Sequence, residues 1–349
     1  TSASIEATAG EGLSFVEWTG DVPDEQKRQN PLMLKVDGVK SVTASFAEVG
    51  KPATWTGAGE DALASNPANW EGGVAPNALA AVILDGNSAE HAMTWDLDIP
   101  LQSWTQAEGY TNTVKFMTGY DPTGFCCLTV NGDVDLQGGS WTHPANSGTT
   151  PSHRINVAVG GNMTIGPKAK IDASKVGYTG YKHGGGKQAN NQGGSYGSRG
   201  SCNSGKIEVW PYGCYYAPEE PGTSGTWGYN GGGAVKLTVA GTLTHNGVID
   251  VNGDSVHGTG GIANNYDPSG GAIYIIAGEI EGAGTLLSQS HTGSNNGSGG
   301  RIAVKLTKEG ADFSNYDIVS RANASSRRNS ASSTGAPGSI YAETAADEP

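Results

Sequence analysis

The chain has 349 residues, of which 55 are glycine and 36% are hydrophobic, so it is long enough to bury a large core. The glycines follow no three-residue period, which excludes collagen, and the apolar content argues against a structureless polymer. The net charge is −13 and no basic stripe is present, which excludes nucleic acids and anionic membranes as expected partners. No apolar run approaches the roughly 20 residues that cross a bilayer. The sequence opens without Met or a signal peptide, so we expect a processed or excerpted chain.

Residues 1–49 alternate polar and apolar side chains from the start, which predicts short strands. An Ala-Thr-Ala strand is followed by Leu13–Trp18, by Asn30-Pro31 before an apolar strand, by an Asp37-Gly38 turn and by a closing strand at 41–46. This order resembles the internalin-type B repeat of bacterial surface proteins. The resemblance implies a small β-grasp-like module in a secreted or cell-surface protein. Such modules have one more strand before the point where this chain starts.

Residues 50–92 carry a Trp55-Thr56-Gly57 segment, an Asn66–Trp70 segment and an Asp85-Gly86 turn. They resemble the segment that introduces the β-helical passenger regions of bacterial surface and autotransporter-like proteins. The resemblance implies an entry cap for the region that follows.

Residues 93–349 contain an irregular repeat of short apolar alternations separated by glycine. A second frame, of the GGAVKL type, marks strand starts at 232, 270, 299 and 338. Three strands joined at glycine corners would form a rung that must stack on its neighbours to pair its backbone. The pattern therefore predicts an all-β right-handed parallel β-helix, a solenoid with long glycine-rich loops. A jelly roll or sandwich is the alternative, disfavoured because two-residue Asn-Gly hairpins are not the main pattern. The corner glycines of the repeat are Gly132, Gly161, Gly241 and Gly278.

Four cysteines, at 126, 127, 202 and 214, show none of the CxxC spacing of zinc or redox sites. Cys202 and Cys214 bracket a short loop and predict a disulfide in an oxidising compartment. Cys126 and Cys127 would form a vicinal disulfide, or one of them would pair with that loop. Four unpaired buried thiols are the alternative.

Motifs for catalysis or metal binding are weak. Lys187 lies in a glycine-rich insertion, but no Ser or Thr follows it and neither a strand nor a helix flanks it, so phosphate binding is disfavoured. Gly193–Gly197 matches the nucleophile-elbow string without the strand-to-helix turn that it requires. The seven histidines have no metal-site spacing. We expect no catalytic residue, no metal and no cofactor.

Carboxylates support one enzymatic alternative, a polysaccharide lyase or hydrolase. Asp133 and Asp135 alternate on one strand face, and Asp172 and Asp250 occupy matching places in two repeats. Arg154 or Arg301 would supply a cation. The default interpretation is that these acids lie on the solvated faces of half-buried strands.

Aromatic residues give the stronger ligand hypothesis, because six of them lie in one short stretch around Cys214. Flat rings with polar tips suit sugar recognition and also anchor protein interfaces. The alternative is that the rings pack their own long loop onto the fold. The six residues are Trp210, Tyr212, Tyr215, Tyr216, Trp227 and Tyr229.

We therefore expect an extracellular, cell-surface structural or adhesive protein of bacterial type, and not an enzyme. Open strand edges would let it assemble head to tail into a filament, each subunit donating a strand to the next. Its expected partners are further copies of itself or other cell-surface proteins, with glycans as a further possibility. A carbohydrate-binding adhesin and the β-helical polysaccharide lyase or hydrolase are the alternatives.

Overall fold

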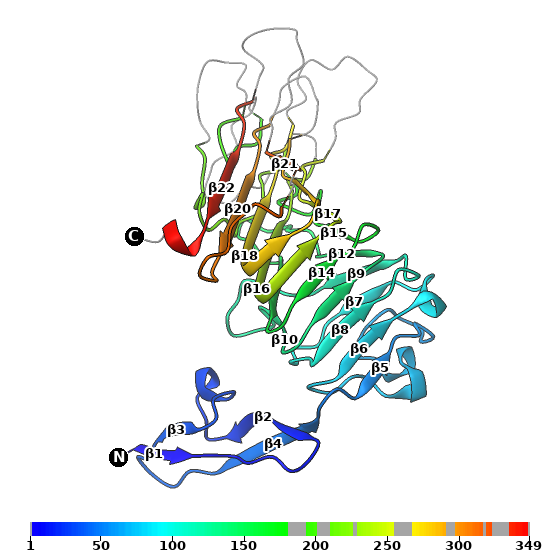
Figure 1. Cartoon of the computed structure of the whole chain (residues 1–349), viewed down its shortest axis with the longest axis vertical. Coiled ribbons are helices and arrows are strands. Elements are labelled where there is room, and N and C mark those ends of the chain that lie inside the picture. The colour runs from blue at the N-terminus through cyan, green and yellow to red at the C-terminus, as the bar shows by residue number, and fades with distance from the viewer. Residues whose placement is uncertain are drawn as a thin grey trace.

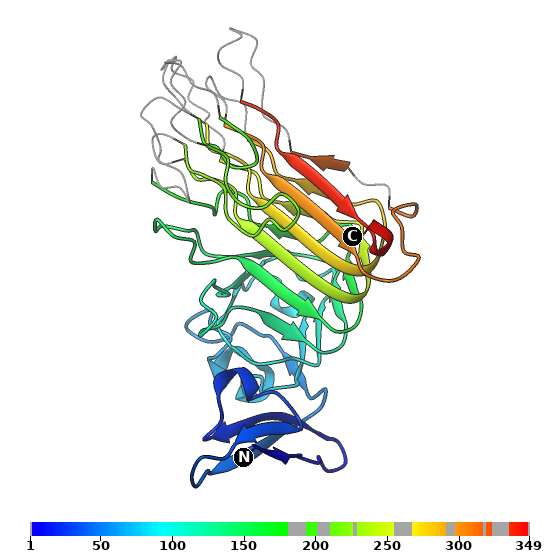
Figure 2. The same cartoon turned by 90° about the vertical axis from the view of Figure 1, so that its left-hand side faces the viewer.

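The computed structural model describes residues 2–180, 193–200, 210–225, 229–254, 267–290, 297–316, 319–322 and 335–347. Strands dominate these residues, and the helical turns among them are short 3-10 turns. An N-terminal module of four strands precedes a tall body of stacked strands, with the C-terminal strands far from the module (Figures 1 and 2). None of the described helices is long and apolar enough to cross a membrane. The 3-10 turns are η1 (Asp24–Gln26), η2 (Pro67–Asn69), η3 (Glu71–Gly73), η4 (Gly86–Ser88) and η6 (Ala345–Asp347).

The N-terminal module consists of two antiparallel strand pairs. β1 (Ser2–Ile5) pairs with β3 (Leu32–Lys35), and β2 (Leu13–Gly20) pairs with β4 (Val42–Glu48). Two-stranded ribbons are marginally stable alone, and a small shared core supports these two. The β-grasp-like prediction is wrong, because the strands form two separate ribbons and the only described helical turn in the module is η1. The core residues are Trp18, Val22, Leu32 and Leu34.

The body contains an eleven-stranded sheet in which every strand pairing is parallel. Nine strands follow one another as neighbours, and two further strands, β10 and β13, lie beside them. In chain order the strands are β5 (Pro52–Thr54), β6 (Ala81–Leu84), β8 (Ser103–Gln106), β10 (Leu128–Val130), β11 (Val134–Leu136), β13 (Ile155–Val159), β14 (Met163–Ile165), β16 (Ala234–His245), β18 (Ala272–Glu281), β20 (Arg301–Leu306) and β22 (Ser339–Glu343).

A second parallel sheet has seven strands, and the chain alternates between the two sheets as it proceeds. Along this sheet the strands lie in the order in which they occur in the sequence, so successive strands stack in one direction. The strands are β7 (Met93–Trp95), β9 (Thr113–Phe116), β12 (Ser140–Thr142), β15 (Lys170–Asp172), β17 (Val248–Asp250), β19 (Thr285–Leu287) and β21 (Val319–Arg321).

The predicted right-handed parallel β-helix is contradicted by this arrangement of strands. The described strands form two large parallel sheets of a size and type that is usual in α/β proteins. Gly241 and Gly278, predicted as corners between two strands, instead lie inside the continuous strands β16 and β18. The pairing of these two strands shifts register between Val239 and Thr242, which lets the ladder continue past the glycines. Glycine corners are therefore wrong at Gly241 and Gly278, whereas Gly132 lies between β10 and β11 and Gly161 lies between β13 and β14.

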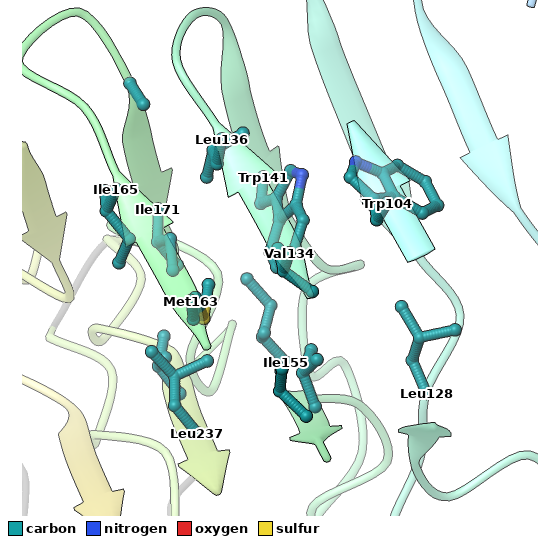
Figure 3. Packing of buried hydrophobic residues seen from close by; sticks show 14 of the residues in the cluster. Trp104, Leu128, Val134, Leu136, Trp141, Ile155, Met163, Ile165, Ile171 and Leu237 are labelled. Carbon is teal, nitrogen blue, oxygen red and sulfur yellow. The ribbon is translucent and has the colours of Figure 1, made fainter. Parts of the chain in front are cut away.

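The core fills the space between the two sheets with one side chain of every two along each strand (Figure 3). Trp104 and Trp141 are fully buried, with ring centroids 5.8 Å apart and planes almost perpendicular. The ring centroid of Trp95 lies 5.2 Å from that of Trp104, and the ring centroid of Trp70 lies 6.4 Å from that of Trp95. Edge-to-face rings are a favourable packing geometry. Trp95, Trp104 and Trp141 lie on β7, β8 and β12, so this run of tryptophans belongs to the core of the N-terminal half of the body.

Residues 193–196 and 221–225 of the glycine-rich insertions are buried against the body. Ser298 N–H donates to Gly194 O (2.8 Å), and Gly222 N–H donates to Gly232 O (2.7 Å). A Cβ atom added at Gly271 would lie 1.9 Å from Gly233 O. Segments far apart in the sequence therefore touch through their main chains, which only glycine permits at these positions.

Two buried histidines make the stability of the body depend on pH. His143 Nε2 accepts from Ala234 N–H (3.2 Å), and its Nδ1 lies 2.8 Å from Pro144 O, so the ring is neutral with its proton on Nδ1. His245 Nδ1 lies 2.6 Å from the Tyr316 hydroxyl. Burial lowers the pKa of each histidine from 6.5 to about 4. Each ring is therefore stable only in its neutral form.

We expect the free energy of unfolding to be highest above pH 6.5 and to fall as the pH drops towards about 4. Between these values the unfolded chain binds more protons than the folded one, and each histidine removes about 2 kcal/mol between pH 7 and 5. Urea titrations at pH 5, 6 and 7 measure this slope. A His143→Gln/His245→Gln variant should show a flatter slope, and an equal slope in both proteins would contradict the assignment.

Candidate functional site

The outer face of the eleven-stranded sheet carries a row of side chains across its last strands. The ladder aligns Lys236 of β16, Tyr274 of β18, Ala303 of β20 and Tyr341 of β22. Lys236 Nζ lies 5.5 Å from the centre of the Tyr274 ring. Alternation along each strand turns these side chains away from the core. Residues 193–200 and 210–225 contact this face through the side chains of Tyr196, Tyr212 and Glu219.

Tyr196 and Tyr212 fasten these two segments to the sheet. Their ring centroids are 4.8 Å apart, and they pack against Ala234 and Ala272, whose small side chains leave room for them. Arg301 Nη2 donates to Tyr212 O (2.9 Å), and its guanidinium lies 5.4 Å from the Tyr196 ring centre. Burial raises the pKa of both tyrosines. Tyr212, predicted as a ligand-binding ring, therefore packs inward.

Glu219 provides the second attachment of residues 210–225 to the sheet. Its carboxylate accepts from Arg154 Nη1 and from Lys236 Nζ, and its backbone carbonyl accepts from the Tyr120 hydroxyl. The Arg154 guanidinium lies 4.5 Å from the Tyr120 ring centre and its side chain is only 11% exposed. Burial raises the pKa of Glu219, but the hydrogen bonds and charges of Lys236 and Arg154 outweigh it and lower the pKa overall. Glu219 is thus an ionised clamp between residues 210–225 and the sheet.

Beyond these attachments, the loop exposes three aromatic rings. Trp210 is 67% exposed, Tyr215 54% and Tyr216 47%. Tyr341 of β22 joins them, with its ring centroid 5.6 Å from Tyr215 and 6.4 Å from Tyr216. We call Trp210, Tyr215, Tyr216 and Tyr341 the aromatic face; ring contacts join the three tyrosines, and Trp210 belongs to it as the exposed ring at the start of the same loop. Three of these rings were singled out from sequence, whereas Tyr341 was missed.

Charged groups border the aromatic face. Lys305 Nζ lies 5.2 Å from the centre of the Tyr216 ring and 5.8 Å from that of Tyr341, and it pairs with Glu343 at 2.8 Å. The Tyr341 hydroxyl also donates to Glu343 (2.8 Å). Lys305 and Glu343 occupy outward-facing positions in the apolar–polar alternation of β20 and β22. This alternation is the only sequence feature that points to them. An ammonium and a carboxylate next to flat rings can donate to and accept from a polar ligand.

No protein-family model, curated protein or solved structure matches this chain. The resemblances inferred for residues 1–49 and 50–92 therefore stay predictions.

Two further aromatic residues, Trp227 and Tyr229, were predicted from the sequence as ligand-binding rings. Tyr229 is half-buried, and its backbone carbonyl accepts from Gly225 N–H (2.8 Å). Trp227 lies outside the described residues. Neither contributes a described contact to the aromatic face.

The candidate carboxylates serve local structure. Asp172 and Asp250 lie opposite each other in the ladder, and Lys170 Nζ binds both, at 2.8 and 3.1 Å. Burial raises the pKa of Asp172, but Lys170 and Ser174 outweigh it and lower the pKa overall, so this acid stays ionised. In the part of the chain that the structure describes, no group of three His, Cys, Asp or Glu residues is placed to hold a metal ion.

Asp133 and Asp135 also have structural partners. Asp133 Oδ1 accepts from Asn162 N–H (2.7 Å), and Asp135 Oδ1 accepts from Gln137 Nε2 (2.6 Å). Both predicted cations are engaged as well, Arg154 with Glu219 and Arg301 with main-chain oxygens. The structure therefore does not bring these acids and cations into one site.

Ser195, the serine of the Gly193–Gly197 motif, is not placed as a nucleophile. Ser195 is fully buried, and its hydroxyl oxygen accepts from Gly200 N–H (2.9 Å). A nucleophile elbow instead presents its serine at an open surface. Lys187 lies outside the described residues.

The predicted disulfides are not formed among the described cysteines. Cys126, Cys127 and Cys214 are free, so neither the vicinal disulfide nor a bridge to Cys214 is present. Cys202 lies outside the described residues. Burial raises the pKa of the Cys127 thiol, which disfavours the reactive thiolate.

Proposed function

We propose that this protein is a non-catalytic, extracellular adhesive protein that binds glycans through the aromatic face. The observation that carries the proposal is the exposure of Trp210, Tyr215 and Tyr216 in a loop that is itself clamped to the sheet. Large exposed rings cost solvation free energy, and a cluster of them commonly marks a binding surface. The extracellular location is supported by the resemblance of residues 1–49 to repeats of surface proteins.

Glycans suit this surface better than an apolar partner. Tyrosine and tryptophan rings stack on the C–H faces of sugars, while their polar tips and neighbouring charges bond the hydroxyl groups. Lys305 and Glu343 provide such groups beside Tyr341. The clamp at Glu219 orders the loop before a ligand arrives, which reduces the entropy lost on binding.

Neutral glycans are the favoured ligand class. The cations that border the aromatic face are already paired with carboxylates, Lys305 with Glu343 and Lys236 with Glu219. The net charge of −13 also repels acidic polymers. We therefore expect weak binding of uronic-acid polymers, and no product release from them with or without Ca²⁺.

The Trp210→Ala variant tests this proposal. Loss of one stacked ring should weaken retention on neutral polysaccharides by about tenfold, because about 1.4 kcal/mol of binding free energy is lost. Affinity electrophoresis through gels that contain cellulose derivatives, soluble chitin or mannan measures this retention, with polygalacturonate as the acidic comparison.

The Val74→Ala variant is the matched control. Val74 is another exposed apolar residue of the body, away from the loop, and its loss should leave retention unchanged. No retention of the unaltered protein on any of these gels would refute the proposal, as would equal retention of the Trp210→Ala variant with an unchanged unfolding midpoint.

A further inference from the structure

A polar cavity lies on the outer face of the eleven-stranded sheet, where β16 and β18 end. Its volume is about 590 Å³, within the range of about 300–1,000 Å³ that is usual for small-molecule sites. The ladder forms its floor by placing Thr242 beside Glu279 and Thr244 beside Glu281. The segment 310–315 forms one wall. We call this space the polar cavity, and its lining residues are distinct from those of the aromatic face.

Contacts within the chain hold the wall of the polar cavity in place. Gly282 N–H donates to Asn315 O (3.1 Å), and Tyr316 N–H donates to Phe313 O (3.1 Å). The Phe313 side chain packs against the main core, and the Tyr316 hydroxyl lies 2.6 Å from the buried His245 ring. A wall that is fixed in this way limits the entropy lost when a ligand binds.

The floor of the polar cavity offers hydrogen-bond donors and acceptors side by side. Thr244 Oγ1 donates to Glu281 Oε1 (2.8 Å), so the other oxygen of this carboxylate and the lone pairs of the hydroxyl can still accept. Asn162 Oδ1 accepts from Thr242 N–H (2.9 Å), which leaves its Nδ2 group as a donor. In the wall, Asp312 Oδ1 accepts from Ser314 N–H (2.8 Å), and its second oxygen is a further acceptor.

The chemistry of the lining favours a neutral ligand rich in hydroxyl groups. Glu281 and Asp312 repel anions, and Lys308, the nearby ammonium, is already paired with Glu279 at 2.8 Å. The described residues contain no trio of His, Cys, Asp or Glu side chains that is placed to hold a metal ion. The mainly polar lining disfavours an apolar ligand. Sugar hydroxyl groups both donate and accept, so they match this mixture of groups.

We propose that the polar cavity is a second glycan-binding site, which holds a neutral saccharide unit through Asn162, Thr244, Glu281 and Asp312. The proposal rests on the proposed function for the kind of polymer, whereas the site itself consists of other residues and uses hydrogen bonds in place of ring stacking. Both sites lie on the outer face of the same sheet. A polysaccharide that engages both is retained more strongly than by either site alone, because the second contact is intramolecular.

Carbodiimide labelling of carboxylates in the whole chain, read by mass spectrometry, tests this site with cellohexaose and chitohexaose as probes. We expect the labelling of Glu281 and Asp312, which are both exposed, to fall severalfold when sugar is bound. The exposed Glu11 of the N-terminal module is the control, and its labelling should not change. The protection should persist in the Trp210→Ala variant, because that change alters the aromatic face and not the cavity.

A variant of the floor gives a second test. In Thr244→Val/Glu281→Ala, two hydrogen-bonding groups are lost from exposed or half-exposed positions, and the sugar concentration that half-protects Asp312 should rise about tenfold. Thr105→Val is the matched control, since Thr105 also lies half-exposed on the outer face, in β8, but outside the polar cavity. It should leave that concentration unchanged. Equal concentrations for the floor variant and the unaltered protein would contradict the assigned contacts.

The remaining outcomes also decide the proposal. Sugar binding that leaves Glu281 and Asp312 fully labelled would overturn it, as would the absence of binding by both sugars. Loss of the protection in the Trp210→Ala variant would show that these carboxylates respond to the aromatic face alone, which rules out a separate site. If the protection persists while Trp210→Ala leaves retention on polysaccharide unchanged, the aromatic face is refuted as the binding site and the polar cavity is supported.

Discussion

Replacement of Gly271 by alanine is expected to remove most of the folding free energy of the body. The added Cβ atom would lie 1.9 Å from Gly233 O and 2.6 Å from Gly232 C, which are backbone atoms without freedom to move aside. Gly271 N–H also donates to Val251 O (2.8 Å), and Ala272 N–H donates to Gly233 O (3.0 Å), so a shift of the strand breaks the ladder at the start of β18. The loss should exceed about 4 kcal/mol, against a typical total of about 5–15 kcal/mol.

Gly124→Ala is the matched control for this prediction. Its added Cβ atom would meet only Asp121 O, at an ordinary 3.9 Å, so the change should be within about 0.5 kcal/mol of neutral. Thermal unfolding followed by circular dichroism compares the two variants. Equal midpoints for Gly271→Ala and the unaltered protein would show that the packed glycine segments do not approach each other as described.

Replacement of Glu219 by glutamine is expected to release residues 210–225 from the sheet while the sheets stay folded. Glutamine keeps the shape of the side chain but removes the charge that Arg154 and Lys236 share. Arg154 is only 11% exposed, so its guanidinium would lose its carboxylate in a poorly solvated place. We expect about 2 kcal/mol of local destabilisation, less than for a fully buried pair because Glu219 is one-third exposed.

Limited proteolysis measures this release directly, since cleavage within 210–225 should become about tenfold faster or more. Retention on neutral polysaccharide should fall in parallel, because the aromatic rings lose their fixed positions. Glu108→Gln is the control, as Glu108 pairs with Lys168 on the exposed surface, where ion pairs contribute little. Unchanged cleavage in the Glu219→Gln variant would show that the clamp does not hold the loop.

The sequence pattern identified strands but not their arrangement. The alternations that follow Gly233, Gly271 and Gly300 lie in β16, β18 and β20, because one apolar residue in two faces a core. Gly241 and Gly278 do not end a strand, since a register shift accommodates them. A glycine that forms a corner and a glycine that sits in a bulge look alike in sequence.

The candidate site was predictable only in part for a similar reason. The aromatic content of 210–216 pointed to this loop, but composition does not distinguish Tyr212, which packs on Ala234 and Ala272, from the exposed Tyr215. Tyr341 lies far from the loop in sequence and joins it through the order of stacked strands. That order depends on long-range pairing, which no local pattern encodes.

Covalent footprinting of aromatic side chains tests the central claim most directly. Hydroxyl-radical labelling of the whole chain, with and without neutral hexasaccharides such as cellohexaose and chitohexaose, reports the solvent access of each ring. We expect protection of Trp210, Tyr215, Tyr216 and Tyr341 by a bound sugar, and no change at the exposed control residue Met33. Saccharide binding that leaves these four rings as accessible as before would contradict the claim that the aromatic face is the binding site.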